Sequence, residues 1–368
     1  MMRWVFLFGL LAALAACADR SFAPLRPDAS GVGTPHEIFV ATQRAADDRG
    51  WFGPERATDL SYARLNVVVP PAHIPGRISN GLANPDPQRD FTISSKQDFA
   101  GAASFHRSLS QSLAALPPDQ REVMLYVHGY NNTFFDGLFR ATQMKHDYAT
   151  PGVTLHYSWP SAASPLGYTY DRDSVLLSRD GLEQVLRDIR QAGAQRVVLI
   201  GHSLGAMLVM ETLRQIEIRT PGWSTSALGG VILISPDLDV ELFKTQATRF
   251  ETLPEPFAIF VSSRDRALQL SARINGASAR LGNLTDASEL GDYPVTLIDV
   301  SQFSDGDGAR HFTIGTSPVL IALLRQSDSL NRAFQRDSAG RADLLAGTVL
   351  TVRNATQLIL SPQMLRQN

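Results

Sequence analysis

One short motif places a serine where it could act as a nucleophile. Gly201-His202-Ser203-Leu204-Gly205 ends a short apolar run and opens a helix-like pattern. Glycines on both sides of a serine allow a tight strand-to-helix turn, which lifts the hydroxyl clear of a sheet. Small residues also cluster by chance, so a purely structural turn is the alternative. The position of the motif between a strand and a helix favours a nucleophilic Ser203.

A serine hydroxyl is a poor nucleophile unless a histidine base, oriented by a carboxylate, removes its proton. In hydrolases with this kind of turn the chain order is serine, acid, histidine. The chain has eight histidines, and His311 alone follows Ser203. If that order holds, His311 is the base. It lies after an apolar run, in a loop that could present it, although a histidine without a role is the alternative.

Three aspartates follow predicted strands and are candidates for the acid. Asp237 and Asp239 lie in ISPDLD, and Asp265 lies in VSSRDRAL. The usual place of the acid, after the penultimate strand, favours Asp265. Asp237 and Asp239 precede a predicted helix and could cap it instead. They remain alternatives to Asp265.

An acyl transfer reaction also needs backbone donors for the oxyanion. Leu204 begins the predicted helix, so its amide can point toward the negative charge. A second donor is expected from the loop after an earlier strand, where Gly129 and Tyr130 follow His128. His128 precedes the serine, so we expect it to brace this loop through hydrogen bonds rather than to act as the base.

The stretch Ser164 to Leu177 follows a strand end and is predicted to form part of an acyl pocket or a modest cap. Trp159, with Tyr168 or Tyr170, is a candidate for its lining, and packing is an equally good interpretation of these rings. The predicted pocket residues are Trp159 and Tyr168, together with His202 next to the serine and with His128 and Asn131 of the oxyanion loop.

These residues must be positioned by a repeated theme of a short apolar strand, a turn and an amphipathic helix. The expected strands are 36–42, 63–70, 123–129, 153–159, 196–202, 230–236, 257–263 and 295–301. The expected helices are 104–116, 134–148, 178–192, 204–218, 240–250, 268–281 and 312–324. This alternation predicts an α/β fold with a mostly parallel sheet of about eight strands and helices on both faces. Sites in such sheets lie beyond the carboxyl ends of the strands, where the candidate residues occur.

Together these features resemble the α/β-hydrolase superfamily. More closely, the chain resembles a bacterial group of uncharacterised α/β-hydrolases, domain of unknown function 900. The similar motifs are IFVATQR (38–44), VHGYNNTF (127–134), SWPS (158–161), GHSLG (201–205), SPDLD (235–239) and SSRDRAL (262–268). VHGYNNTF is the most specific of them, and the resemblance runs from about His36 to Leu324. It implies hydrolase chemistry without a defined substrate.

The N-terminus resembles the signal of a bacterial lipoprotein. The apolar run from Trp4 to Leu14 is too short for a bilayer, which takes roughly 20 apolar residues. Leu14-Ala15-Ala16-Cys17 resembles a lipobox, which implies cleavage before Cys17 and acylation of that residue. An ordinary signal with a chance cysteine is the alternative. We expect a lipid-anchored envelope protein, with Ala18 favouring the outer membrane over the inner. Cys17 is the only cysteine, so no internal disulfide forms.

The predicted organisation is a signal peptide (1–16), a tether (17–35), a hydrolase domain (36–335) and a C-terminal extension (336–368) with a possible short hairpin. Lys and Arg number 34 against 36 Asp and Glu, a net charge of −2, so no strong field attracts nucleic acid. No cofactor and no metal are predicted.

The sequence thus predicts a serine hydrolase of the carboxylesterase or lipase kind. Ser203 would attack an ester carbonyl, His311 would act as general base and Asp265 would orient it. No insertion resembles a full lipase lid, which favours small or medium acyl esters. The alternatives are an acyltransferase with the same three residues and a non-catalytic envelope scaffold on a hydrolase fold.

Overall fold

The computed structural model describes residues 22–274, 276, 279–303, 311–326, 348–352 and 354–360. The predicted signal peptide, Cys17, the start of the tether and most of the C-terminal extension lie outside these residues. None of the helices among the described residues combines the length and the apolar character needed to cross a membrane.

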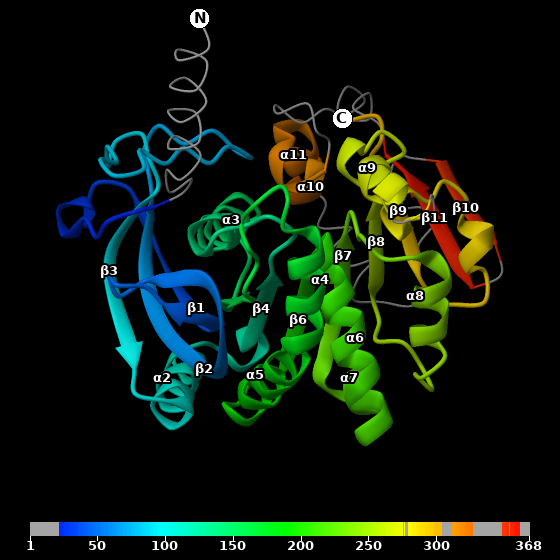
Figure 1. The fold of residues 1–368 in the computed structure, drawn as a ribbon, viewed down its shortest axis with the longest axis horizontal. Helices are drawn as coiled ribbons and strands as arrows, with labels where there is room; N and C mark the ends of the chain where they lie inside the picture. Colours follow the sequence, from blue (N-terminus) through cyan, green and yellow to red (C-terminus); the bar gives the residue numbers. More distant parts are fainter. Residues whose placement is uncertain are drawn as a thin grey trace, which may run out of the picture.

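A single sheet forms the centre of the described chain (Figure 1). Its strand order is β10-β11-β9-β8-β7-β6-β4-β5-β1-β2-β3, and every pair from β11 to β1 is parallel. At one edge β2 and β3 continue antiparallel, and at the other β10 pairs antiparallel with β11. The strands are β1 (Thr34–Ala46), β2 (Phe52–Val69), β3 (Thr92–Phe99), β4 (Glu122–Val127), β5 (Val153–Ser158), β6 (Arg196–His202), β7 (Leu228–Ile234), β8 (Phe257–Val261), β9 (Thr296–Asp299), β10 (Thr348–Val352) and β11 (Ala355–Ile359).

Helices cover both faces of the sheet because its central strands are apolar on both sides. In β4, Val123 and Leu125 join a core that includes residues of α2, α5, α6 and α8, whereas Met124 and Tyr126 join a second core with α3 and α11. The predicted mostly parallel sheet between two helical layers is therefore confirmed. The helices are α2 (Ala102–Ala114), α3 (Phe134–Asp147), α4 (Tyr168–Leu177), α5 (Arg179–Gln191), α6 (Leu204–Arg219), α7 (Trp223–Ala227), α8 (Val240–Ala247), α9 (Arg266–Ile274), α10 (Thr313–Thr316) and α11 (Pro318–Gln326).

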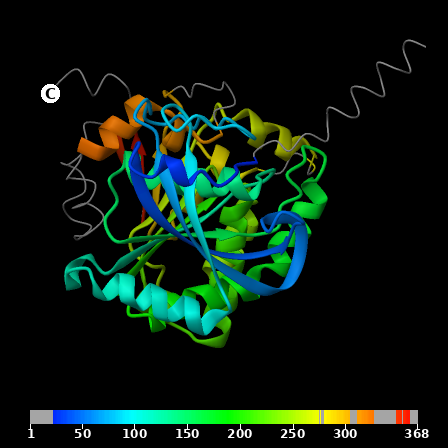
Figure 2. The same ribbon diagram turned by 90° about the vertical axis from the view of Figure 1, so that its left-hand side faces the viewer.

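The predicted count of about eight strands is too low, because the sheet has eleven among the described residues. Strand β3, TISSKQDF, is an edge strand (Figure 2) and lacks an apolar run, since Ser95, Gln97 and Asp98 are exposed. Strands β10 and β11 lie in the C-terminal extension, where a short hairpin is expected. They pair with each other, and β11 also pairs with β9, so both belong to the central sheet.

One helix prediction needs correction, and helix α4 was not predicted. The single helix expected over 312–324 is divided into α10 and α11 at Ser317, since Pro318 lacks an amide hydrogen and is favoured at the start of a helix. Helix α4 occupies part of the stretch expected to form a cap or pocket wall. Its first turn contains two tyrosines, and its apolar pattern is weak, so periodicity does not reveal it.

Candidate active site

The candidate residues gather at the carboxyl edge of the parallel strands, as the fold requires. Ser203 follows β6, Asp265 lies between β8 and α9, and His311 lies between β9 and α10. The loop with Gly129 and Tyr130 follows β4, which pairs directly with β6. Residues far apart in the sequence therefore reach one edge of the sheet.

Ser203 occupies a backbone conformation that an ordinary serine avoids. Its φ is 53° and its ψ is −123°, and the residue is almost completely buried. A non-glycine residue with positive φ costs of order 1–3 kcal/mol and persists only where its surroundings hold it. Helix α6 begins at the next residue, so the Leu204 amide has no acceptor within that helix. The turn thus has the geometry of a nucleophile elbow.

The second glycine of the motif is required by close packing against β4. A Cβ at Gly205 would lie 2.2 Å from the His128 carbonyl oxygen and 2.6 Å from that of Val127. The predicted oxyanion loop also lies close to the serine, since a Cβ at Gly129 would lie 2.9 Å from Ser203 Cβ. Any side chain at these two positions would push the loop and the nucleophile apart.

His311 and Asp265 form a hydrogen-bonded pair. His311 Nδ1 lies 2.8 Å from Asp265 Oδ2, and the Asp265 side chain is fully buried. The other carboxylate oxygen accepts a hydrogen bond from the Leu268 amide at 3.0 Å, which fixes the carboxylate at the start of α9. A neutral His311 that donates through Nδ1 keeps Nε2 as its basic nitrogen.

The alternative acids have other partners. Asp239 caps α8 by accepting from the amides of Glu241 and Leu242 at 2.9 and 3.1 Å. Asp237 accepts from the hydroxyls of Ser271 and Tyr168. Its Oδ1 also lies 3.4 Å from Nε of the buried Arg280. Of the three candidate acids, Asp265 is the one that hydrogen-bonds to His311 in the part of the chain that the structure describes.

His202, just before the nucleophile, packs against His311 with 4.8 Å between the ring centroids. Burial, and then the neighbouring His311, lower the pKa of His202 well below its ordinary value. This histidine is therefore neutral near pH 7.

The Ser203 hydroxyl makes no hydrogen bond within the described residues. Hydrogen bonds between catalytic residues often form fully only when substrate binds, so this does not exclude Ser203 as the nucleophile. The set of Ser203, His311 and Asp265 stays a prediction.

Two buried charges brace the predicted oxyanion loop, and sequence reasoning did not single them out. Arg44, at the end of β1, donates to the carbonyl oxygens of Asn132 at 2.8 Å and Ser161 at 3.1 Å. Asp171, on α4, accepts from the Asn131 amide at 3.1 Å and the Ser161 hydroxyl at 2.6 Å. Burial lowers the pKa of Arg44 to about 10 and raises the pKa of Asp171. Arg44 lies three positions after the apolar run 38–41 of β1, and a charged residue this close to the end of a buried run is the signal that could have revealed it.

The predicted pocket residues separate into two groups. His128 and Trp159 are fully buried and stack with ring centroids 4.7 Å apart, and the Trp159 indole donates to the His128 carbonyl at 2.7 Å. Both rings therefore pack beneath the loop. Asn131 has a φ of 58°, and Tyr168 lies edge-on to Tyr130 at 5.4 Å. Contact of any of them with substrate stays a prediction.

Comparison with known proteins gives a family and distant structural likenesses. A family model described as alpha/beta hydrolase of unknown function (DUF900) matches residues 102–327. None of the curated proteins compared with the chain matches it. A CIB-like hydrolase from Thermoplasma acidophilum is 18% identical, with 57% of this chain and 89% of that one covered and a TM-score of 0.34.

Two further solved structures are similar at the same distant level. A hydrolase from Agrobacterium vitis is 14% identical over 82% of this chain and 99% of its own, with a TM-score of 0.36. Lipase B from Aspergillus fumigatus is 13% identical over 63% of this chain and 58% of its own, with a TM-score of 0.36.

Proposed function

The chain belongs to the DUF900 family of alpha/beta hydrolases, and from this premise we propose that it is a serine esterase that forms an acyl-enzyme on Ser203. The observation that carries the proposal is the pair of His311 and the buried Asp265, 2.8 Å apart, at the same strand edge as the strained Ser203.

In the proposed reaction, Ser203 Oγ attacks the ester carbonyl while His311 Nε2 takes the hydroxyl proton. The imidazolium then gives this proton to the alkoxide that leaves as an alcohol. Water, deprotonated by the same nitrogen, attacks the acyl-enzyme and releases the carboxylic acid and free Ser203. Asp265 stabilises the imidazolium in both halves through the Nδ1 contact.

The oxyanion of each tetrahedral intermediate would be bound by backbone amides. Leu204 supplies one from the N-terminus of α6, where the helix dipole also favours negative charge. The Gly129–Tyr130 segment supplies the other, since Gly129 lies against Ser203. Loss of one such donor reduces kcat by about 10²–10³-fold in enzymes of this kind.

Small or medium acyl esters are the proposed substrates. The segment between β5 and α5 is short and contains the ten-residue helix α4. Its preceding loop is tied to the oxyanion loop, because the Tyr130 hydroxyl donates to the Pro165 carbonyl at 2.6 Å. A cap held by such contacts leaves little length for a mobile lid.

Labelling with a fluorophosphonate, which reacts with activated serines, tests the proposal. We expect wild type and the surface variant Ser226→Ala to be labelled equally, Ser203→Ala to be unlabelled and His311→Ala to be labelled far more slowly. Folded wild-type protein that stays unlabelled would contradict a nucleophilic Ser203. Product analysis with added alcohol or amine acceptors then separates hydrolysis from acyl transfer, and p-nitrophenyl esters of increasing chain length measure the pocket.

A further inference from the structure

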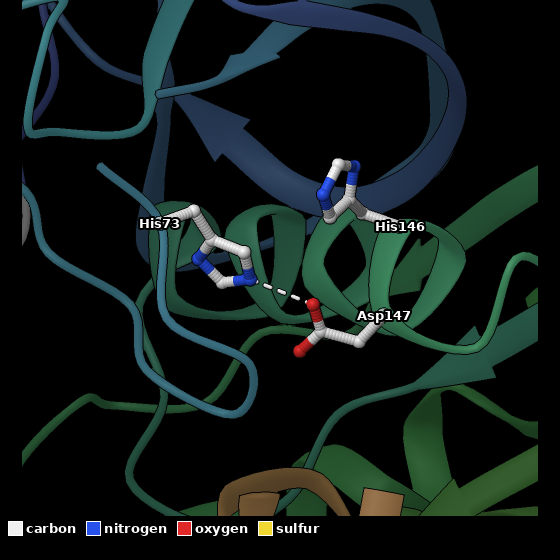
Figure 3. A group of neighbouring side chains, drawn as sticks. All are labelled: His73, His146 and Asp147. Carbon is white, nitrogen blue, oxygen red and sulfur yellow. Dashed lines mark hydrogen bonds and ion pairs between the residues drawn. The ribbon is translucent and has the colours of Figure 1, made fainter. Parts of the chain in front are cut away.

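A second group of chemically active side chains lies on elements that carry none of the candidate catalytic residues. His73 comes from the loop between β2 and β3, whereas His146 and Asp147 come from the last turn of α3 (Figure 3). One ligand atom from each residue lies within 4.8 Å of the other two. The closest pair is His73 Nε2 and Asp147 Oδ1, at 2.6 Å.

The Asp147 carboxylate is held in a fixed orientation. Its Oδ2 accepts from the Gly76 amide at 2.7 Å and from the Gln143 side-chain amide. These bonds occupy one oxygen and leave Oδ1 directed at His73. The side chain of Asp147 is 1% exposed and that of His73 is 6% exposed, so both donors are largely withdrawn from water.

A third imidazole supports His146. His36, on β1, places Nε2 3.0 Å from His146 Nδ1, and the rings meet edge-on. Metal-binding histidines and carboxylates typically have their remaining polar atoms held by neighbouring groups, which fix the ligand orientation. Gly76 and Gln143 play this part for Asp147, and His36 plays it for His146.

We propose that His73, His146 and Asp147 bind a divalent transition metal ion of the zinc type. Two imidazoles and one carboxylate are a donor set that zinc accepts, with bonds of about 2.0–2.2 Å. Tetrahedral geometry then places donor atoms about 3.4 Å apart. The His73–Asp147 separation of 2.6 Å is shorter than this value, and the other two separations do not exceed 4.8 Å, so small side-chain rotations bring the three donors to it.

The proposal departs from the sequence-based expectation of no metal. The ligands come from two segments far apart in the chain, so no short motif of metal-binding spacing exists. Bound at this position, the ion joins the β2–β3 loop to α3. The same loop packs on α10, since a Cβ at Gly76 would lie 2.7 Å from the Thr316 carbonyl oxygen. We therefore expect the ion to stabilise this side of the fold.

Zinc chloride titrated into protein freed of metal with EDTA tests the site by calorimetry. We expect one tight site per chain in wild type, unchanged in His106→Ala, whose histidine lies on α2. His73→Gln keeps a donor for Asp147 but removes the imidazole, and it should weaken zinc binding by more than about 100-fold. His146→Gln should do the same. Zinc should also raise the melting temperature of wild type, because the ion binds only the folded site.

Cobalt(II) provides a second readout, because its visible spectrum reports tetrahedral nitrogen and oxygen coordination. Wild type should develop this spectrum, and the double variant His73→Gln/His146→Gln should not. Equal zinc uptake by wild type and the double variant would overturn the proposal. Ser203→Ala should bind zinc like wild type, so failure of the metal site and failure of the proposed esterase are distinguishable.

Discussion

At the scale of single residues, the choice among three aspartates can be tested directly. Asp265→Asn replaces an acceptor of the His311 Nδ1 proton with an amide that can also donate, so the imidazole loses its preferred tautomer and its counter-charge. We expect kcat for a p-nitrophenyl ester to fall by about 10²–10⁴-fold, with a smaller change in KM. Steady-state kinetics of the folded variant measure both.

The other two aspartates are the matched controls for this experiment. Asp239→Asn retains a good helix cap and should keep wild-type kcat. Asp237→Asn removes the charge beside the buried Arg280, so it should reduce stability more than kcat. An Asp265→Asn enzyme with unchanged kcat would exclude Asp265 as the acid.

At the scale of elements, the predicted oxyanion loop depends on contacts from β1 and α4. Arg44→Met removes the hydrogen bonds to Asn132 and Ser161 and leaves buried carbonyls unpaired. We expect kcat to fall about 10–100-fold because the loop amides lose their fixed position, with little change in KM. The free energy of unfolding should also fall, by about 2–4 kcal/mol.

Arg64→Met is the control for this substitution, because Arg64 lies on β2 and pairs near the surface with Glu37 and Gln97. It should leave kcat unchanged. If Arg44→Met proved less stable but retained full kcat, Arg44 would be a structural residue without influence on the oxyanion loop.

Element patterns also show what the sequence could and could not predict. Ser203, Asp265 and His311 each follow a short apolar strand, and the helices after Ser203 and Asp265 are predicted, whereas the helix after His311 is divided at Ser317. Their order and the edge at which they meet follow from these patterns. Contacts between polar side chains of different elements do not follow from these patterns, because the residues that make them have the same sequence spacing as polar residues exposed to solvent.

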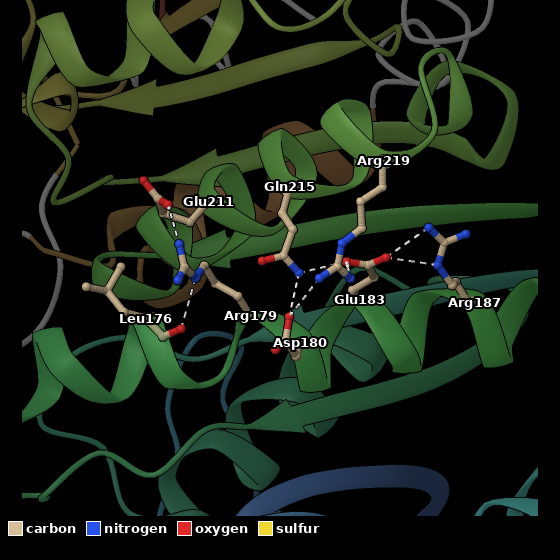
Figure 4. A network of polar contacts seen from close by, with 8 residues as sticks. All are labelled: Leu176, Arg179, Asp180, Glu183, Arg187, Glu211, Gln215 and Arg219. Carbon is tan, nitrogen blue, oxygen red and sulfur yellow. Dashed lines mark hydrogen bonds and ion pairs between the residues drawn. The ribbon is translucent and has the colours of Figure 1, made fainter.

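Helices α5 and α6 illustrate this limit (Figure 4). Periodicity predicts both, but their polar side chains also join the two helices. Glu183 on α5, almost buried, pairs with Arg187 at 2.9 Å and with Arg219 of α6 at 3.1 Å. Gln215 of α6 donates to Glu183 at 2.7 Å. This network holds α6, the helix that begins directly after Ser203, and only the structure reveals it.

At the scale of the whole molecule, three histidines are buried close to the sheet around the site. Burial is the main cause that lowers the pKa of His128 and His202 well below the ordinary value, and it lowers the pKa of His156 to about 3. His156 Nδ1 lies 3.2 Å from the Tyr126 carbonyl oxygen, and its buried Nε2 has no hydrogen-bond partner among the residues that the structure describes. Protonation would place an unpaired charge between β5 and α3.

Acid should therefore destabilise the fold through these groups. The unfolded chain binds the His156 proton below about pH 6.5, whereas the folded chain binds it only near pH 3. Stability from this difference is complete above pH 6.5 and is lost as the pH falls toward 3. We expect His156 to account for about 3 kcal/mol of the decrease in unfolding free energy between about pH 7 and pH 4. Urea unfolding at a series of pH values, in buffers that contain EDTA, measures this decrease in unfolding free energy. The decrease should be smaller in His156→Asn and the same as in wild type in the control His106→Asn. Equal slopes in wild type and His156→Asn would show that this histidine does not control acid stability.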